Sequence, residues 1–221
     1  MQKNLNKKYK LFLFDLDGTL LDTAREFHLA LNEVLKRENK PSQNFENVRE
    51  RVSDGAGALV TLGFNIDEQS IYFEEKRNSL LEAYKKVFLE SKPFEGVEEL
   101  ISLFEKKRIL WGIVTNKPKI FSAQIFKSLG WDKKAKILVC PDDVENLRKP
   151  DPASLKYALR ELKQLPKDTI YVGDNWRDIE AARNANITPV FAEYGYIKDK
   201  KFPLNKNGFN IKNIKEILAF T

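Results

Sequence analysis

Cysteine and histidine are nearly absent from this chain, which has one of each among its 221 residues, Cys140 and His28. A single cysteine cannot form an internal disulfide bond. Because Cys140 ends an apolar segment, we expect it to pack as a small hydrophobic residue. His28 falls in an expected helix and is interpreted as structural, which excludes a serine or cysteine triad that depends on histidine.

Long apolar runs are absent as well. No segment approaches the roughly 18 consecutive apolar residues that a membrane span needs. The basic first residues are followed by only four apolar ones, at positions 11–14, which are too few for the apolar region of a secretory signal. We therefore expect a soluble cytoplasmic protein with no membrane partner.

The charge balance is moderately basic, with 38 lysines and arginines against 32 aspartates and glutamates. The excess lies at the ends, since residues 1–10 hold four lysines and no acid, and residues 198–221 hold six lysines and two acids. Charge confined to the chain ends favours solvated tails over a basic groove, so we predict no nucleic-acid partner.

Five short apolar segments, rich in β-branched and aromatic residues, are typical of buried parallel strands. They cover residues 10–15, 109–116, 136–140, 169–174 and 188–192. Between them, apolar residues recur at helical spacing in 97–104 and 155–162. Strands that alternate with helices predict an α/β fold with a doubly wound, Rossmann-like parallel sheet.

About 80 residues separate the first predicted strand from the helix at Val97, although strand-to-helix loops usually have about 2 to 6. Two apolar stripes mark this interval as helical. Their members are Phe27, Ala30, Leu31, Val34 and Leu35, then Phe73, Leu80, Leu81, Tyr84, Val87 and Phe88. We predict a core domain of residues 1–21 and 93–221 and an inserted all-helical domain of residues 22–92. The glycines of 53–59 are expected in a loop between its helices, either a plain connection or a specificity loop.

Polar residues follow several predicted strands, which is where ligands bind in doubly wound sheets. Together with a lysine that precedes the helix at Leu155, they are Asp15, Asp17, Thr115, Asn116, Lys149, Asp174 and Asp178. Crowded carboxylates repel each other unless a cation joins them, and all-oxygen ligands favour Mg²⁺. Lysine, threonine and amide groups can donate hydrogen bonds to phosphoryl oxygens. The set predicts a phosphate ester as substrate, with Asp15 as nucleophile and Asp17 as acid and base.

Four motifs, DLDGTLLD, VTNK, RKPDP and GDNWRDIEAA, resemble in order those of the haloacid dehalogenase superfamily of phosphatases. The resemblance implies a helical type 1 cap in the inserted region and an aspartyl-phosphate intermediate at Asp15. It also implies that Asp17 is the acid/base and that its backbone carbonyl binds Mg²⁺. The implied metal set is Asp15, Asp17, Asp174 and Asp178, and the implied phosphoryl-binding set is Thr115, Asn116 and Lys149, which also pairs with Asp15.

A narrower resemblance links VSDGAGALVTLGF, LWGIVTNKP, YVGDNWRDIEAAR and YGYI to bacterial phosphoglycolate phosphatases, and ILVCPDDVENLRKPDP to N-acetylmuramic acid 6-phosphate phosphatases. It implies a small phosphorylated metabolite as substrate, phosphoglycolate first, and a monomer or homodimer. A sugar phosphomutase or a nucleotidase would use the same core, whereas a phosphoacceptor signalling module would not need the inserted domain. The chain departs from this branch at two places, since the branch usually has a glycine near Asn186 and a small or acidic residue where Trp176 stands.

Overall fold

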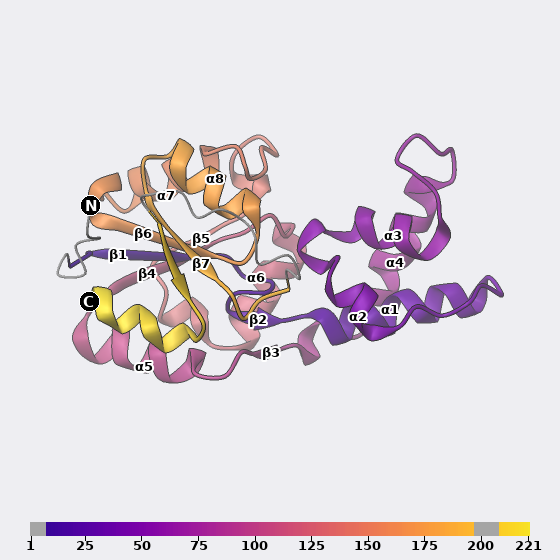
Figure 1. Cartoon of the computed structure of the whole chain (residues 1–221), viewed down its shortest axis with the longest axis horizontal. Coiled ribbons are helices and arrows are strands. Elements are labelled where there is room, and N and C mark those ends of the chain that lie inside the picture. Colours follow the sequence, from indigo (N-terminus) through magenta and orange to yellow (C-terminus); the bar gives the residue numbers. More distant parts are fainter. Residues whose placement is uncertain (1–7, 197–207) are drawn as a thin grey trace. The chain divides into compact units, whose positions relative to one another are not determined.

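The computed structural model describes residues 8–196 and 208–221. The chain divides into two compact units, one made of the residues up to Leu20 together with Pro93–Thr221, the other of Leu21–Lys92 (Figure 1). Each unit has its own set of buried apolar residues. None of the helices in the described part of the chain has the length and apolar composition that crossing a membrane requires.

A six-stranded parallel sheet forms the centre of the first unit, in the order β5-β4-β1-β6-β7-β8. The strands are β1 (Leu11–Phe14), β4 (Leu110–Val114), β5 (Leu138–Val139), β6 (Thr169–Gly173), β7 (Thr188–Ala192) and β8 (Phe209–Ile211). In the centre, Phe14 of β1 is aligned with Ile113 of β4 and with Val172 of β6. The predicted α/β class with a doubly wound sheet is confirmed, and a strand lies in each of the five predicted segments.

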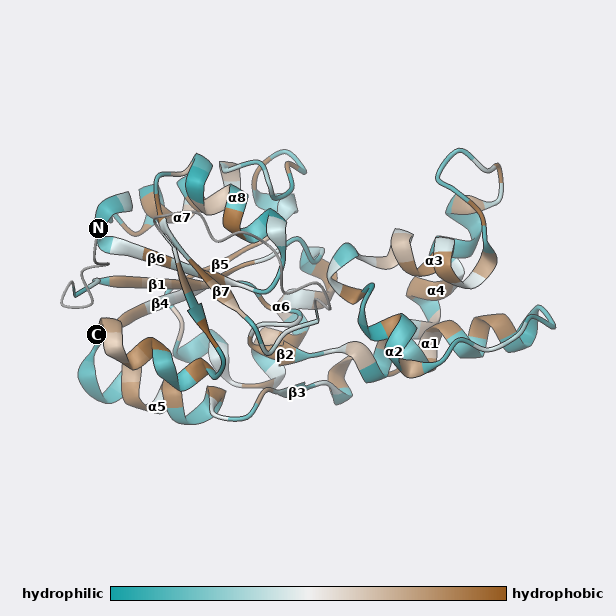
Figure 2. Cartoon of the chain, viewed as in Figure 1, coloured by the Kyte–Doolittle hydropathy of each residue, from teal (hydrophilic) through white to brown (hydrophobic). Residues whose placement is uncertain are grey.

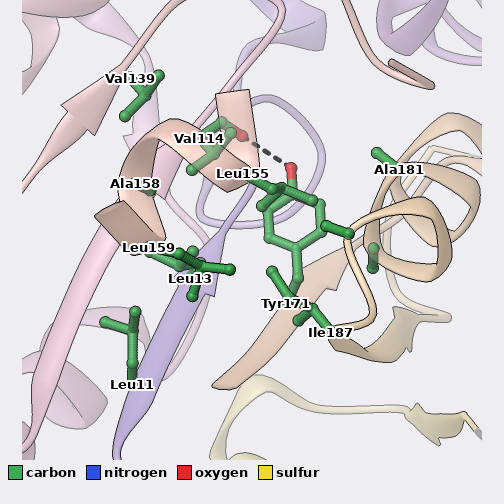
Figure 3. Packing of buried hydrophobic residues seen from close by; sticks show 12 residues of the cluster. Leu11, Leu13, Val114, Val139, Leu155, Ala158, Leu159, Tyr171, Ala181 and Ile187 are labelled. Atoms are coloured by element: carbon green, nitrogen blue, oxygen red, sulfur yellow. Dashed lines mark hydrogen bonds between the residues drawn. The ribbon is translucent and has the colours of Figure 1, made fainter. Parts of the chain in front are cut away.

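Helices cover both faces of this sheet. Successive side chains of a strand point to opposite faces, so the apolar strands have side chains to bury on each face. The helices are α5 (Val97–Lys107), α6 (Lys119–Ser128), α7 (Ala153–Glu161) and α8 (Trp176–Asn184), with short 3₁₀ helices η3 (Trp131–Lys133), η4 (Pro141–Asp143) and η5 (Pro166–Asp168). Leu11 and Leu13 belong to a buried cluster with residues of α7 and α8 (Figure 3). On the other face, the ring of Phe12 lies 5.0 Å from that of Phe104 in α5. Figure 2 shows the hydrophobic run of β1 that this burial on both faces requires.

The last residues of the chain are part of the core, so the predicted solvated tail is wrong for residues 208–221. They form β8 and the 3₁₀ helix η6 (Ile214–Phe220). Ile211, Ile214, Ile217 and Phe220 are buried. Apolar residues at every third position suit the three-residue turn of a 3₁₀ helix, which leaves the intervening lysines exposed. Lys8 and Lys10 of the other expected tail are exposed. The basic residues in 1–7 and 198–207 and the isoleucine of YGYI lie outside the described residues.

The unit of Leu21–Lys92 is helical, with α1 (Ala24–Arg37), α2 (Phe45–Arg49), η1 (Val52–Asp54), α3 (Ala56–Phe64), α4 (Phe73–Tyr84) and η2 (Phe88–Glu90). Two short paired strands, β2 (Leu21–Asp22) and β3 (Lys92–Pro93), lie where the chain passes between the units. The rings of Phe27 in α1 and Tyr84 in α4 stack with centroids 3.9 Å apart. The second predicted stripe continues to Phe88, but α4 ends at Tyr84. Beyond it, the N–H of Val87 bonds to the carbonyl of Tyr84 three residues earlier, which is the spacing of a 3₁₀ helix rather than an α-helix.

Residues 53–59 are not a loop throughout, which corrects that prediction. Gly55 adopts a φ of 88°, and α3 begins at the next residue, Ala56. This positive φ, which favours glycine, lies at the junction of the two helical segments η1 and α3. His28 lies in α1, where its Nε2 atom is 2.9 Å from the amide nitrogen of Asn32 and 3.0 Å from the carbonyl oxygen of Gln43. These contacts agree with a structural role for the histidine.

Candidate active site

The carboxyl ends of β1, β4 and β6 lie side by side, because the three strands are parallel and aligned. Asp15 follows β1, and its N–H bonds to the carbonyl of Val172 in β6 at 2.8 Å. Thr115 follows β4, and its N–H bonds to the carbonyl of Val139 in β5 at 3.0 Å. The loops that leave these strands therefore bring their side chains to one edge of the sheet.

A buried lysine joins two of the predicted acids. The Nζ atom of Lys149 lies 2.8 Å from Oδ1 of Asp15 and 2.6 Å from Oδ1 of Asp178. Burial alone would lower the pKa of Lys149, but the two carboxylates raise it above its ordinary value, so the ammonium form is favoured. The pKa of Asp15 is raised to about 7, mainly by burial. The charge of Lys149 opposes this rise, whereas the charges of Asp178 and Asp17 add to it. The lysine therefore does not neutralise this group of acids by itself.

Tyr171 of β6 places its hydroxyl beside the same lysine, a contact that the sequence motifs do not reveal. Nζ of Lys149 donates to this oxygen at 2.7 Å, and the hydroxyl donates to the carbonyl of Val114 at 2.7 Å (Figure 3). Oδ1 of Asp178 lies 3.2 Å from the hydroxyl. The only signal in the sequence is a tyrosine within the predicted strand TIYVGD, since a buried tyrosine hydroxyl needs a partner.

Asp174 follows β6 and is fully buried. The N–H of Tyr196 donates to its Oδ2 at 3.0 Å, and the hydroxyl of Thr19 donates to its Oδ1 at 3.4 Å. Two glycines leave room for this carboxyl group, because a Cβ at Gly18 would lie 2.4 Å from Oδ2 and one at Gly195 would lie 2.2 Å from Cβ of Asp174. Gly18 also has a φ of 81°, so the motif DLDGT needs its glycine for two reasons.

Three acids can provide ligands for one metal ion, since oxygens of Asp15, Asp174 and Asp178 lie within 4.8 Å of one another. Oxygen donors of this kind suit a hard divalent cation. Oδ1 of Asp15 contacts Nζ of Lys149 at 2.8 Å, and a carboxylate has further lone pairs that can bind a cation. Both oxygens of Asp178 already accept hydrogen bonds, one from Lys149 and the other from the N–H of Asn175 at 3.0 Å. The residues fit a divalent cation, and in Asp174 as in Asp178 each carboxylate oxygen also accepts a hydrogen bond from the protein.

Asp17 and Asn116 have partners that the motifs did not suggest. Nζ of Lys117 lies 3.0 and 3.3 Å from the two carboxylate oxygens of Asp17. Lys117 ends the motif VTNK, but nothing in the spacing of that motif links it to Asp17. The side chain of Asn116 accepts from the N–H of Lys149 at 2.8 Å and donates to its carbonyl at 3.1 Å. Asn116 therefore holds the backbone of Lys149, and its own backbone N–H is the group that it can offer to a ligand.

Two further residues noted in the sequence, Cys140 and Trp176, do not belong to the group that could hold a metal ion. The thiol of Cys140 is buried 3.1 Å from the hydroxyl of Ser122, and burial raises its pKa to about 11. Cys140 is therefore a packing residue, as expected. Trp176 is the first residue of α8 and is exposed, with the guanidinium of Arg177 5.4 Å from its ring.

Comparison with known proteins gives the family of this chain. A family model described as haloacid dehalogenase-like hydrolase matches residues 12–192. An N-acetylmuramic acid 6-phosphate phosphatase from Pseudomonas putida is 39% identical over 199 residues, covering 90% of this chain and 89% of the relative. A phosphoglycolate phosphatase from Xylella fastidiosa is 34% identical over 198 residues, covering 87% and 83%. The chain belongs to the haloacid dehalogenase-like hydrolase family.

Solved structures share the fold. A haloacid dehalogenase-like family hydrolase from Streptococcus pneumoniae superposes with a TM-score of 0.84 at 19% identity, covering 96% of this chain and 98% of that one. A predicted phosphoglycolate phosphatase from Haemophilus somnus gives a TM-score of 0.83 at 24% identity, covering 95% and 96%. Family and relatives together make this chain a phosphatase, that is, a phosphoric monoester hydrolase, of a family that generally uses a divalent metal.

Proposed function

We propose that the chain hydrolyses a small phosphate monoester through an aspartyl-phosphate intermediate at Asp15, with Mg²⁺ as its metal. The observation that supports this most directly is the 2.8 Å contact of Lys149 with Asp15, beside two further buried acids. A carboxylate held at a strand end by an ammonium group is placed to attack phosphorus, while the ammonium offsets the charge of the phosphoryl group.

Two transfers make up the proposed reaction. In the first, a carboxylate oxygen of Asp15 bonds to phosphorus while the ester P–O bond breaks, and Asp17 gives a proton to the leaving oxygen. In the second, a water oxygen bonds to phosphorus while the bond to Asp15 breaks, and Asp17 takes the proton of that water. The hydroxyl of Thr115, the N–H of Asn116 and the ammonium of Lys149 donate to the phosphoryl oxygens.

Asp15, Asp174 and the backbone carbonyl of Asp17 are the proposed Mg²⁺ ligands, with Asp178 acting directly or through a water molecule. When bound, the ion neutralises charge on the acids and on the transferring group. The charges of the described residues support a divalent ion. Four carboxylates and the two lysines that contact them leave two uncompensated negative charges.

Two substrates are proposed, in an order that the relatives support. N-acetylmuramic acid 6-phosphate comes first, because phosphatases of that name from Pseudomonas putida and Pseudomonas aeruginosa are 39% and 37% identical to this chain. Phosphoglycolate, which the sequence motifs placed first, comes second, because phosphoglycolate phosphatases from Xylella and Xanthomonas are 34% and 33% identical. The proposed setting is the cytoplasm, with a monomer or homodimer and no nucleic-acid partner.

The helical unit is proposed to be the type 1 cap that selects the leaving group of the substrate. The support is that the residues proposed at the strand ends of the core bind the phosphoryl oxygens, hold the metal and transfer one proton. These tasks are the same for every phosphate monoester. Recognition of a sugar or a short acid then needs other residues, and the glycines of 53–59 are candidates for close approach to such a group.

The test of the proposed function is phosphate release from N-acetylmuramic acid 6-phosphate, phosphoglycolate, hexose phosphates, nucleoside monophosphates and an activated aryl phosphate. We expect release to stop in excess EDTA and to return with Mg²⁺ but not with Ca²⁺, whose larger and looser coordination disturbs in-line geometry. Full turnover of the aryl phosphate in EDTA would contradict the proposal. Transfer of the phosphoryl group to a second sugar hydroxyl would indicate a mutase, and a phosphorylated chain that never turns over would indicate a signalling module.

A further inference from the structure

A second buried lysine, Lys117, forms an ion pair with the proposed acid/base residue, Asp17. Its Nζ atom lies 3.0 Å from Oδ1 and 3.3 Å from Oδ2 of the carboxylate, so the ammonium faces both oxygens. The side chain of Lys117 is 4% exposed and that of Asp17 is 15% exposed. This pair is distinct from the contact of Lys149 with Asp15, because each lysine faces a different acid of the motif DLD.

The sheet brings the two residues together across 100 positions of sequence. Asp17 lies three residues beyond the end of β1, and Lys117 lies three residues beyond the end of the neighbouring parallel strand β4. The backbone at Lys117 is held in place, because its N–H donates to the hydroxyl of Thr115 at 3.1 Å. The hydroxyl of Ser122 in α6 donates to the carbonyl of Pro118 at 2.9 Å and secures the residue that follows.

The burial of Lys117 gives the contact an orienting effect. A buried ammonium is costly without a counter-charge, so the lysine side chain is favoured where it meets the carboxylate. A lysine has many rotamers in solution, and ordering it beside Asp17 restricts the carboxylate in turn. Without Lys117, the Asp17 side chain would lose this restraint while the like charge of Asp15 remains nearby.

We propose that Lys117 is a positioning residue that holds the Asp17 side chain where, as a carboxylic acid, it can protonate the leaving oxygen and, as the resulting carboxylate, accept a proton from the attacking water. This inference rests on the proposed function, because it assigns a support to one residue of that reaction. Lys117 itself forms no bond to phosphorus and transfers no proton. Its contribution is made through Asp17, so it should vanish when Asp17 cannot act as an acid.

The test is a double-mutant cycle of Lys117→Met and Asp17→Asn, with an alkyl phosphate and an aryl phosphate as substrates. Lys117→Met is expected to lower kcat for the alkyl phosphate by about 10- to 100-fold and to change KM by less than about twofold. With the aryl phosphate, whose leaving oxygen needs less protonation, the first step should be nearly normal. Phosphoenzyme should then accumulate, seen as one added phosphoryl group by rapid-quench mass spectrometry. In the Asp17→Asn background, Lys117→Met should cause no further loss.

Two further variants serve as controls. Lys117→Arg keeps the charge and should recover part of the rate for the alkyl phosphate, whereas Lys119→Met should leave the rate unchanged. Lys119 is a matched control because it is also a lysine, two residues further on, and pairs with Asp143 at an exposed site. If Lys117→Met does not fold, as judged by thermal unfolding, Lys117→Gln keeps a hydrogen-bond donor without charge and enters the same cycle.

The inference is overturned if Lys117→Met lowers the rate equally in the wild-type and Asp17→Asn backgrounds, or mainly raises KM. Either result would make Lys117 a direct ligand of the substrate. Failure of the proposed function looks different, because the wild-type chain would then release no phosphate from any ester in the panel.

Discussion

The carboxyl group of Asp17 can be tested apart from the rest of the site. Asp17→Asn keeps the backbone carbonyl proposed for Mg²⁺ but can neither give nor take the proton. We expect the rate for an alkyl phosphate to fall by about 10² to 10⁴, and phosphoenzyme at Asp15 to accumulate with an aryl phosphate. Rapid-quench kinetics and intact-mass measurement check both outcomes.

The control for Asp17→Asn is Asp22→Asn, because the carboxylate of Asp22 makes a local contact, accepting a hydrogen bond from the N–H of Ala24 at 3.2 Å at the start of α1. That variant should keep its activity. Unchanged hydrolysis of both esters by Asp17→Asn would contradict the acid/base role. A lower Mg²⁺ affinity with an unchanged rate at saturating metal would make Asp17 a ligand only.

Another single residue, Glu26, should make stability depend on pH. Burial raises the pKa of Glu26 above its ordinary value, even though the hydroxyl of Ser91 donates to the carboxylate at 3.0 Å. The folded state therefore binds the proton more tightly than the unfolded state does. The stability due to this proton is present below the ordinary pKa and is lost as the pH rises through the raised pKa. Glu26→Gln should increase the free energy of unfolding at pH 7 and change it little at pH 4.

Glu33, on the same helix, provides a control of opposite sign. Hydrogen bonds from Lys86 and Arg37 lower the pKa of Glu33, so its charge is stabilising above its ordinary pKa and this contribution is lost as the pH falls. Glu33→Gln should weaken the fold slightly at pH 7, because the site is exposed and screened. Urea unfolding of both variants at pH 4 and pH 7 gives the comparison. A loss of stability for Glu26→Gln at pH 7 would contradict the assigned sign.

At the scale of elements, η6 should contribute to stability, although it lies in the segment whose lysines suggested a solvated tail. Ile217 is fully buried in this helix, and η6 packs against α5. Ile217→Ala should lower the free energy of unfolding by about 2 to 5 kcal/mol, because it removes buried methyl groups and leaves a cavity. Chemical denaturation measures this loss. The exposed Lys212→Ala is the control and should change it by less than about 0.5 kcal/mol. Equal effects of the two substitutions would mean that η6 does not contribute to the core.

At the scale of the whole molecule, the division into two units predicts where substrate preference resides. Exchange of residues 22–92 for the matching segment of a relative with another substrate should move the preference to that of the relative. The reason is that the roles proposed for the core residues concern only the phosphoryl group and its leaving oxygen, which all phosphate monoesters share. Measurement of kcat/KM for N-acetylmuramic acid 6-phosphate and phosphoglycolate in the wild-type chain and in the chimaera checks this. Preference that stays with the core would contradict a selective role for the helical unit.

The whole fold also shows where sequence patterns give the wrong structure. The lysines of 208–221 indicated a tail because charge was counted without regard to spacing, although the apolar residues at 211, 214, 217 and 220 recur every third position. The apolar stripe of α4 continues past the end of that helix and suggested a longer one. The reason is that side chains of a 3₁₀ turn can continue the apolar face of an α-helix. In both regions the apolar residues were visible, but the backbone geometry depends on what they pack against.

The sequence by itself determined the α/β class, the five predicted strands and the residues that follow them, because side-chain periodicity and motif order are local properties. It also singled out Asp15, Asp174 and Asp178 after predicted strands and Lys149 before a predicted helix, and the fold brings these four together. Their roles in catalysis stay predictions. Only the tertiary structure decided which partners meet: Tyr171 with Lys149, the side chain of Asn116 with the backbone of Lys149, and Lys117 with Asp17. Such contacts join distant parts of the chain, so they depend on the order and register of neighbouring strands, which the pattern of a single segment does not encode.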